Sequence, residues 1–164
     1  MGAVSRPIPF TRVENWLFTL PVWKSQLESM REQLSRIPGL TQKFDLVPIY
    51  GKGQKNEAIL NEIIRRLQLQ NVEIPLMELR IDVLEAAIHS LQEEDQQFVE
   101  ERYMRRLPSM LVMEKLGLTH RMFYKRRKRL LSHIYRFVGG EASILFVDDK
   151  EANSDVDSSD DSAE

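Results

Sequence analysis

The chain has 164 residues, of which 42% are hydrophobic and 29% charged, a balance typical of a globular protein with one compact domain or a small domain with extensions. No apolar run approaches the roughly 18 residues of a membrane span, and no signal segment opens the sequence, so we expect a cytoplasmic protein. The absence of cysteine excludes disulfides, thiolate zinc sites and a cysteine nucleophile.

The net charge of −2 is unevenly distributed along the chain. Residues 148–164 hold eight acids against one basic residue, Lys150, so residues 1–147 together carry +5. The final stretch "SDVDSSDDSAE" has no aromatic residue and too little apolar surface to offset the entropy of ordering it. We therefore expect a basic folded part followed by a disordered acidic tail.

Helical spacing of apolar residues predicts a first helix, which Thr11 caps and Pro21 interrupts, and a long amphipathic helix from Pro21 to about Ile37. Residues 40–55 hold two glycines and a proline without a clear period, which indicates a connector. A helix over residues 56–70 follows. Its apolar face consists of aliphatic residues three or four positions apart: Ile59, Leu60, Ile63, Ile64 and Leu67.

Pro75 is predicted to start another helix. Its apolar face contains Leu76, Leu79, Val83, Leu84, Ala87, Ile88 and Leu91. The segment "LQEEDQQFVEERYM" predicts a helix with acids in its early turns, where the helix dipole favours them, and with Phe98 and Tyr103 in its later half.

Beyond a break at Pro108, a short helix containing Leu111, Val112 and Leu116 is predicted to stop at Gly117. Thr119 then caps a final helix that runs to about Val138 before two glycines end it. The segment "ASILFV" at 142–147 is either a short strand or a peptide that docks on the body of the protein. These elements together predict an all-α fold.

The final helix carries seven Lys and Arg residues and no acid. On a helical wheel its apolar side holds Phe123, Leu130, Leu131, Ile134, Phe137 and Val138. The opposite side holds Arg121, Lys125, Lys128, Arg129, Ser132 and Arg136. Like charges four positions apart repel each other by a few tenths of a kcal/mol, a cost that a polyanionic partner would relieve.

A short helix, a tight turn at Gly117 and a longer basic helix form the layout of a helix-turn-helix, whose second helix enters the major groove of double-stranded DNA. Arginine can read guanine edges, whereas lysine mainly positions the helix on phosphates. Arg127 lies near the apolar side and is predicted to pair with an acid such as Glu100 or Glu101. The candidate DNA-binding residues are Thr119, His120, Arg121, Tyr124, Lys125, Lys128 and Arg129.

The segment "LEAAIHSLQEEDQQFVEERYMRRLPSMLVMEKLGLTHRMFYKRRKRLL" resembles the fourth conserved region of bacterial sigma factors, in which an Arg-Tyr pair, here Arg102 and Tyr103, ends the helix before the helix-turn-helix. With the upstream "YGKGQKNEAILNEIIRRLQLQ", "LTHRMFYKRRKRLLSHI" is similar to the ArpU and RinA type phage transcriptional regulators. The resemblance covers about residues 50–137. Two departures, "RRLPS" and "VMEKLG", leave the promoter preference open.

The resemblance implies a phage or prophage late-gene activator that acts in the bacterial cytoplasm at the nucleoid. Together with the helical pattern, we expect a helical region over residues 1–74, a helix-turn-helix DNA-binding domain over 75–138 and a C-terminal segment over 139–164 that includes the acidic tail. RNA polymerase is a partner that the resemblance leaves open. A homodimer through the N-terminal helices is also left open, although an apolar stripe at helical spacing more often packs into the core of the same chain.

Three other functions compete with this hypothesis. Catalysis is disfavoured, because His89, His120 and His133 do not have the spacing of metal ligands, and "GKG" is not a Walker loop. The acids at 93–95 and 100–101 suit a helix N-terminus or a solvated face. No cofactor is expected. A small terminase-like DNA-packaging subunit would combine the same motif with oligomerising helices. A protein-binding module would use the basic helix on an acidic partner, such as RNA polymerase, without touching DNA.

Overall fold

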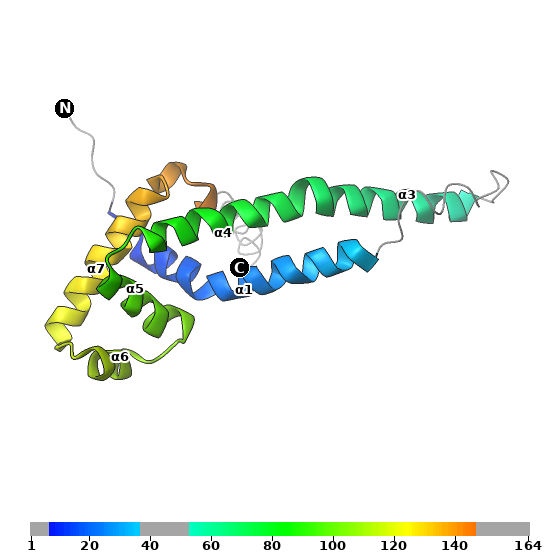
Figure 1. The fold of residues 1–164 in the computed structure, drawn as a ribbon. Helices are drawn as coiled ribbons and strands as arrows, with labels where there is room; N and C mark the ends of the chain where they lie inside the picture. Colours follow the sequence, from blue (N-terminus) through cyan, green and yellow to red (C-terminus); the bar gives the residue numbers. More distant parts are fainter. Residues whose placement is uncertain (1–6, 37–52, 147–164) are drawn as a thin grey trace, which may run out of the picture. The chain divides into compact units, whose positions relative to one another are not determined.

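The computed structural model describes residues 7–36 and 53–146, which contain helices and no strand (Figure 1). The predicted all-α fold is confirmed. The acidic tail and most of the predicted connector lie outside the described residues, although the connector's last three residues already belong to a helix. In the described part of the chain, no helix is both long and apolar enough to cross a membrane.

The chain divides into two compact units that are discontinuous in sequence. Unit 1 comprises Met1–Pro21 and Asp82–Glu164, and unit 2 comprises Val22–Ile81. Helices α1 (Phe10–Arg36) and α4 (Ile74–His89) each continue from one unit into the other. Unit 1 therefore joins residues from both ends of the chain, whereas the predicted functional domains 1–74 and 75–138 stay a prediction.

The interruption predicted at Pro21 is wrong, because α1 continues through this residue. A proline removes one N–H donor and strains the preceding turn, at a cost that neighbouring contacts can offset. Leu17 and Leu20, in the turn before it, are buried, while Pro21 itself is exposed. The helix also begins at Phe10, so Thr11 lies inside it and not at its cap.

Unit 2 is built from residues 22–36 of α1 and from a second helical stretch that runs past Pro75. This stretch comprises α3 (Gly53–Gln68), a π-helical turn η1 (Leu69–Glu73) and the start of α4. In Figure 1 the second half of α1 runs beside η1 and the start of α4 in the opposite direction. Arg31 on α1 bonds Glu78 on α4 at 2.7 Å, which joins the two stretches.

The helix predicted to start at Pro75 is confirmed within one residue, because α4 begins at Ile74, but η1 joins it to α3 without a break. A proline in a helix has no N–H, and its ring meets the carbonyl four residues earlier, here that of Asn71. In η1 the hydrogen bonds reach one residue further, as the bond from the Ile74 N–H to the Leu69 carbonyl shows. This wider turn accommodates the ring without ending the helix.

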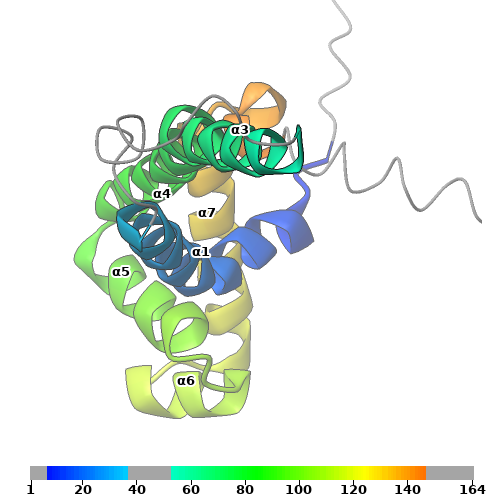
Figure 2. The same ribbon diagram turned by 90° about the vertical axis from the view of Figure 1, so that its right-hand side faces the viewer.

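The core of unit 1 is formed by α5 (Glu93–Val99), the π-helical turn η2 (Glu100–Met104), α6 (Ser109–Leu116), α7 (His120–Phe137), the first half of α1 and the end of α4. In both views α6 lies across the N-terminal end of α7 (Figures 1 and 2). The largest fully buried side chains of unit 1 are Val13, Leu17, Leu20, Leu84, Phe98, Val99, Tyr103, Phe123, Leu130, Leu131 and Ile134.

The segment after α7 docks on this core and forms no strand. It folds into two 3-10 turns, η3 (Gly140–Ala142) and η4 (Ile144–Phe146). The ring of Phe146 is buried with its edge against Trp16, at 4.9 Å between centroids, and lies 6.1 Å from Tyr135. Of the two alternatives for residues 142–147, the docked peptide is confirmed over the described part.

Candidate nucleic-acid interface

The turn between α6 and α7 has the geometry that the sequence predicts. Gly117 adopts a left-handed conformation with φ of 65°, which a side chain would strain, and it ends α6. The Thr119 hydroxyl accepts a hydrogen bond from the Met122 N–H at 3.2 Å and so caps α7. Two helices joined by a three-residue turn are thus present, with α7 starting at His120.

One side of α7 is buried and the opposite side is exposed, as the helical wheel predicts. Phe123, Leu130, Leu131 and Ile134 are each at most 1% exposed, and Val138 is buried just after the helix. Phe137 is the exception at 50% exposure, because it occupies the last position of α7 and its nearest ring is that of His133 on the same helix. Its predicted place in the core is wrong.

The exposed side presents four cations that have no acidic partner among the described residues. They recur at intervals of four, three and eight positions, which places them on one stripe of the helix. They are Arg121, Lys125, Lys128 and Arg136. In the described structure their charge is balanced only by solvent, so this stripe is a site of uncompensated positive potential.

Arg127 is partly buried, with its side chain 24% exposed, and forms an ion pair with a partner other than the predicted Glu100 or Glu101. It donates to Glu14 on α1, whose other carboxylate oxygen accepts from the Tyr103 hydroxyl at 2.9 Å. The hydrogen bond to Glu14 raises the pKa of Arg127, and burial followed by the charge of Glu14 raises the pKa of Tyr103. Arg127 thus has a structural role.

Glu101, the other predicted partner, instead holds α6 to η2. Its Oε1 lies 2.8 Å from the Lys115 Nζ and 3.5 Å from Arg105. Nearby, Arg102 of the Arg-Tyr pair donates to the Leu107 carbonyl at 3.0 Å and stacks over the ring of Phe18. These contacts fix the segment that leads into α6 and α7.

Arg129 differs from the other candidate DNA-binding cations because an acid beneath it holds one end of its guanidinium. Asp95, on α5, is 5% exposed and accepts from an Arg129 Nη at 3.0 Å, with Arg126 at 3.8 Å from the same oxygen. The Arg129 side chain is nevertheless 60% exposed. Its remaining donors therefore face solvent in a restricted orientation, a geometry suited to directional hydrogen bonding.

The N-terminal turn of α7 also presents an exposed pair of rings. The rings of His120 and Tyr124 lie 4.6 Å apart, and Tyr124 is 44% exposed with its edge against the buried Phe123. Their contact restrains both rings at the end of the helix that a major groove would admit first. The sequence-predicted residues Thr119 to Arg129 thus lie on one helix, with Thr119 acting as the cap.

Sequence reasoning missed Asp95 and Glu14 as residues that position the interface. Asp95 was one of three acids in the first turn of α5, where the helix dipole alone explains it. Glu14 precedes Arg127 by 113 residues, and no local pattern links the two. Only the packing of α1 and α5 against α7 reveals these contacts.

Of the three histidines considered in the sequence, His133 lies beside a serine hydroxyl. His133 contacts Ser90 at 2.9 Å, but the Ser90 hydroxyl donates to the Ala87 carbonyl at 2.6 Å. The histidine must therefore be the donor toward Ser90, and it does not activate the hydroxyl as a nucleophile. Among the described residues, no group of three or more His, Asp or Glu side chains is placed to hold a metal ion.

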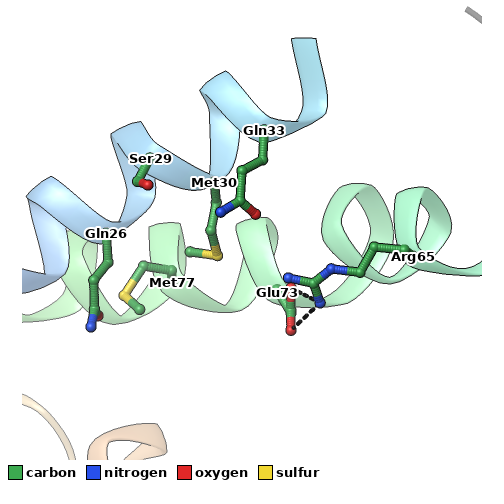
Figure 3. Close-up of a pocket in the computed structure, with 7 residues that line it drawn as sticks. All are labelled: Gln26, Ser29, Met30, Gln33, Arg65, Glu73 and Met77. Carbon is green, nitrogen blue, oxygen red and sulfur yellow. Dashed lines mark hydrogen bonds and ion pairs between the residues drawn. The ribbon is translucent and has the colours of Figure 1, made fainter. Parts of the chain in front are cut away.

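A hollow within unit 2 lies between α1, the end of α3 and the start of α4 (Figure 3). Met30 and Met77 point into the space between the helices, and Arg65 bonds Glu73 at 3.2 Å along its rim. Its other lining residues are Gln26, Ser29 and Gln33. The one cation of the lining, Arg65, is thus paired with its one acid, Glu73.

Comparisons with protein-family models, with curated proteins and with solved structures found no match.

Proposed function

We propose that this protein is a sequence-specific DNA-binding transcriptional regulator that places α7 in the major groove of a duplex. The observation that carries the proposal is the stripe of Arg121, Lys125, Lys128 and Arg136, exposed and without acidic partners among the described residues. The opposite face of α7 packs in the core, and a three-residue turn precedes the helix. A basic, exposed helix in this setting is suited to contact the phosphates of DNA.

The position of each side chain on α7 suggests its role. His120, Arg121, Tyr124 and Lys125 lie in the first turns, which enter the groove first, so these residues are assigned to base contacts. Lys128 and Arg136 lie further along the helix and are assigned to phosphates. Arg129 is assigned to directional recognition, because Asp95 restricts its orientation.

The resemblance of residues 50–137 to the ArpU and RinA type regulators supports late-gene activation in a phage or prophage, in the cytoplasm of the host. A small terminase-like subunit is the alternative that uses the same contacts. The molar mass in solution distinguishes the two, because a packaging subunit would form a ring of eight or more copies, whereas a regulator would be a monomer or dimer.

Salt-dependent DNA binding tests the proposal. Duplexes selected from a random-sequence pool by the full-length protein should bind with an affinity that falls with salt, with a log–log slope of about −2 if Lys128 and Arg136 contact phosphates. Changing Arg121 and Lys125 together to alanine should abolish discrimination between selected and random duplexes, while the salt slope that Lys128 and Arg136 produce should be largely kept.

The matched control changes Arg31 and Arg36 on α1 to alanine, which removes the same charge from exposed positions in unit 2. This control should keep sequence discrimination. Failure to select any duplex, or equal losses in both double variants, would contradict the placement of α7 in the groove. Circular dichroism checks that both variants retain their helices.

One observation favours a protein-binding role beside or instead of DNA binding. On α6, Met110 is 78% exposed and Leu111 is 48% exposed. Exposed Met and Leu side chains on a short helix suit a protein partner better than phosphates. Binding of purified bacterial RNA polymerase core, with loss in a Met110→Gln and Leu111→Gln double variant, would support this second candidate.

A further inference from the structure

The apolar face of α3 remains exposed in the described structure. Leu60, Ile64 and Leu67 are 55%, 44% and 46% exposed. Their steps of four and three positions place them on one stripe of the helix, and Ile63 lies at its margin, half-buried. An exposed apolar stripe along about two turns of a surface helix is a candidate docking surface.

Further along the same helical stretch, the apolar side chains of unit 2 are buried by neighbouring residues. Leu69 in η1 and Ile74 in α4 are 1% and 8% exposed, and Leu27 on α1 is buried with them. Cover therefore begins at Leu69, one residue after α3 ends. The stripe of Leu60, Ile64 and Leu67 consists of the same aliphatic residue types as the buried positions, but no described element covers this stripe.

The order of charges on α3 favours a second copy of the same helix as the occupant. The exposed acids Glu57 and Glu62 precede Arg65 and Arg66 along the helix. Two copies packed in opposite directions about residue 64 place the acidic half of each beside the basic half of the other. Parallel packing would instead oppose like charges, which is unfavourable.

Arg65 remains available for such a contact. Its ion pair with Glu73 is a surface pair, with side-chain exposures of 50% and 42%, and such pairs contribute little in water. A carboxylate from a second copy can therefore approach the same guanidinium at little cost. The contact requires no rearrangement of the buried residues.

We propose that the protein forms a homodimer in which α3 of one copy packs antiparallel on α3 of the other through Leu60, Ile64 and Leu67. The inference goes beyond DNA binding and does not rest on it. Because three partly exposed side chains per copy form a small interface, the dimer should dissociate in about the micromolar range.

The mass of the full-length protein tests the interface. Light scattering or sedimentation from sub-micromolar to about 100 µM should show a concentration-dependent change from monomer to dimer. Leu60→Gln with Leu67→Gln should weaken dimerisation at least tenfold. The matched control, Met110→Gln with Leu111→Gln on α6, should leave it unchanged. A monomer throughout this range, or equal dimerisation by the α3 variant and the wild type, would overturn the proposal.

The absence of cysteine makes the orientation testable by disulfide cross-linking. Glu57→Cys and Asn71→Cys place one thiol each at an exposed position on either side of residue 64. An antiparallel dimer predicts cross-links mainly between the two variants when mixed, and few within either alone. Predominant self-linking of both variants would overturn the antiparallel arrangement. Neither experiment contains DNA, so the result is distinguishable from failure of the proposed function.

Discussion

Helices α3 and α7 are both amphipathic, yet only one of them has its apolar face covered. Leu130 on α7 is 0% exposed, whereas Leu67 on α3 is 46% exposed. The cover of α7 comes from α1 and α5, which precede it by many residues. The difference teaches that periodicity identifies which face of a helix is apolar, whereas the element that covers this face is determined by tertiary packing or by another molecule.

The largest expected effect compares the same substitution in the two helices. Leu130→Ala removes a fully buried side chain and should lower the free energy of unfolding by about 2–5 kcal/mol. Leu67→Ala should lower it by about 1 kcal/mol or less when the protein is monomeric. Urea denaturation at sub-micromolar concentration measures both. Equal losses would show that the faces of the two helices are similarly covered.

A second prediction concerns the buried contact between Tyr103 and Glu14 beneath α7. Because its pKa is raised in the folded state, Tyr103 keeps its proton above about pH 10, where the unfolded chain releases it. Its contribution to stability is complete below that pH and is lost as the pH rises further, at up to about 1.4 kcal/mol per pH unit. Urea denaturation between pH 9 and 11, about one unit either side of the usual phenol pKa, measures this fall in the free energy of unfolding.

Two variants identify the source of this pH dependence. Tyr103→Phe should make the decline above about pH 10 shallower than in the wild type. Glu14→Gln removes the carboxylate charge that adds to the effect of burial and should give an intermediate slope. Identical slopes in all three proteins would show that the phenol does not contribute.

A third prediction concerns the local signal that starts α7. Thr119→Ala removes the hydroxyl that caps the helix and should cost about 1 kcal/mol of unfolding free energy. Thr11→Ala provides the contrast, because Thr11 lies within α1 and is exposed, so its change should be nearly neutral. Thermal denaturation compares the two, and a larger loss at Thr11 would contradict the assigned helix starts.

The smallest effect concerns the acids of the sequence beyond residue 147. Removing residues 148–164 takes away seven net negative charges and should raise the affinity for random-sequence duplexes a few-fold at low salt. The difference should vanish at high salt. An unchanged affinity at every salt concentration would show that these acids do not compete with DNA for the basic stripe of α7.

The sequence predicts well those features that local chemistry determines. The cap at Thr119, the left-handed stop at Gly117 and the buried side of α7 each depend on residues within a few positions of one another. For the same reason the candidate DNA-binding residues were found to share one exposed helix. The all-α fold follows from the same periodicities.

The sequence does not predict features that depend on contacts between distant segments. Pro21 and Pro75 read as helix starts, but buried leucines before Pro21 and the π-helical turn η1 before Pro75 keep both helices continuous. The partner of Arg127 is Glu14 because α1 packs into unit 1, which no motif near Arg127 indicates. The exposure of Leu67 likewise depends on tertiary packing, because no described element covers this side of α3.

Because α1 is continuous through Pro21, one helix carries two fluorescent side chains, one on each side of the proline. The chain has two tryptophans, and Trp16 belongs to unit 1 while Trp23 belongs to unit 2. Replacing either by phenylalanine leaves an emission signal that follows one unit alone. Coincident fluorescence transitions in the two variants would mean that α1 transmits cooperativity across the proline, and separate transitions would give the stability of each unit by itself.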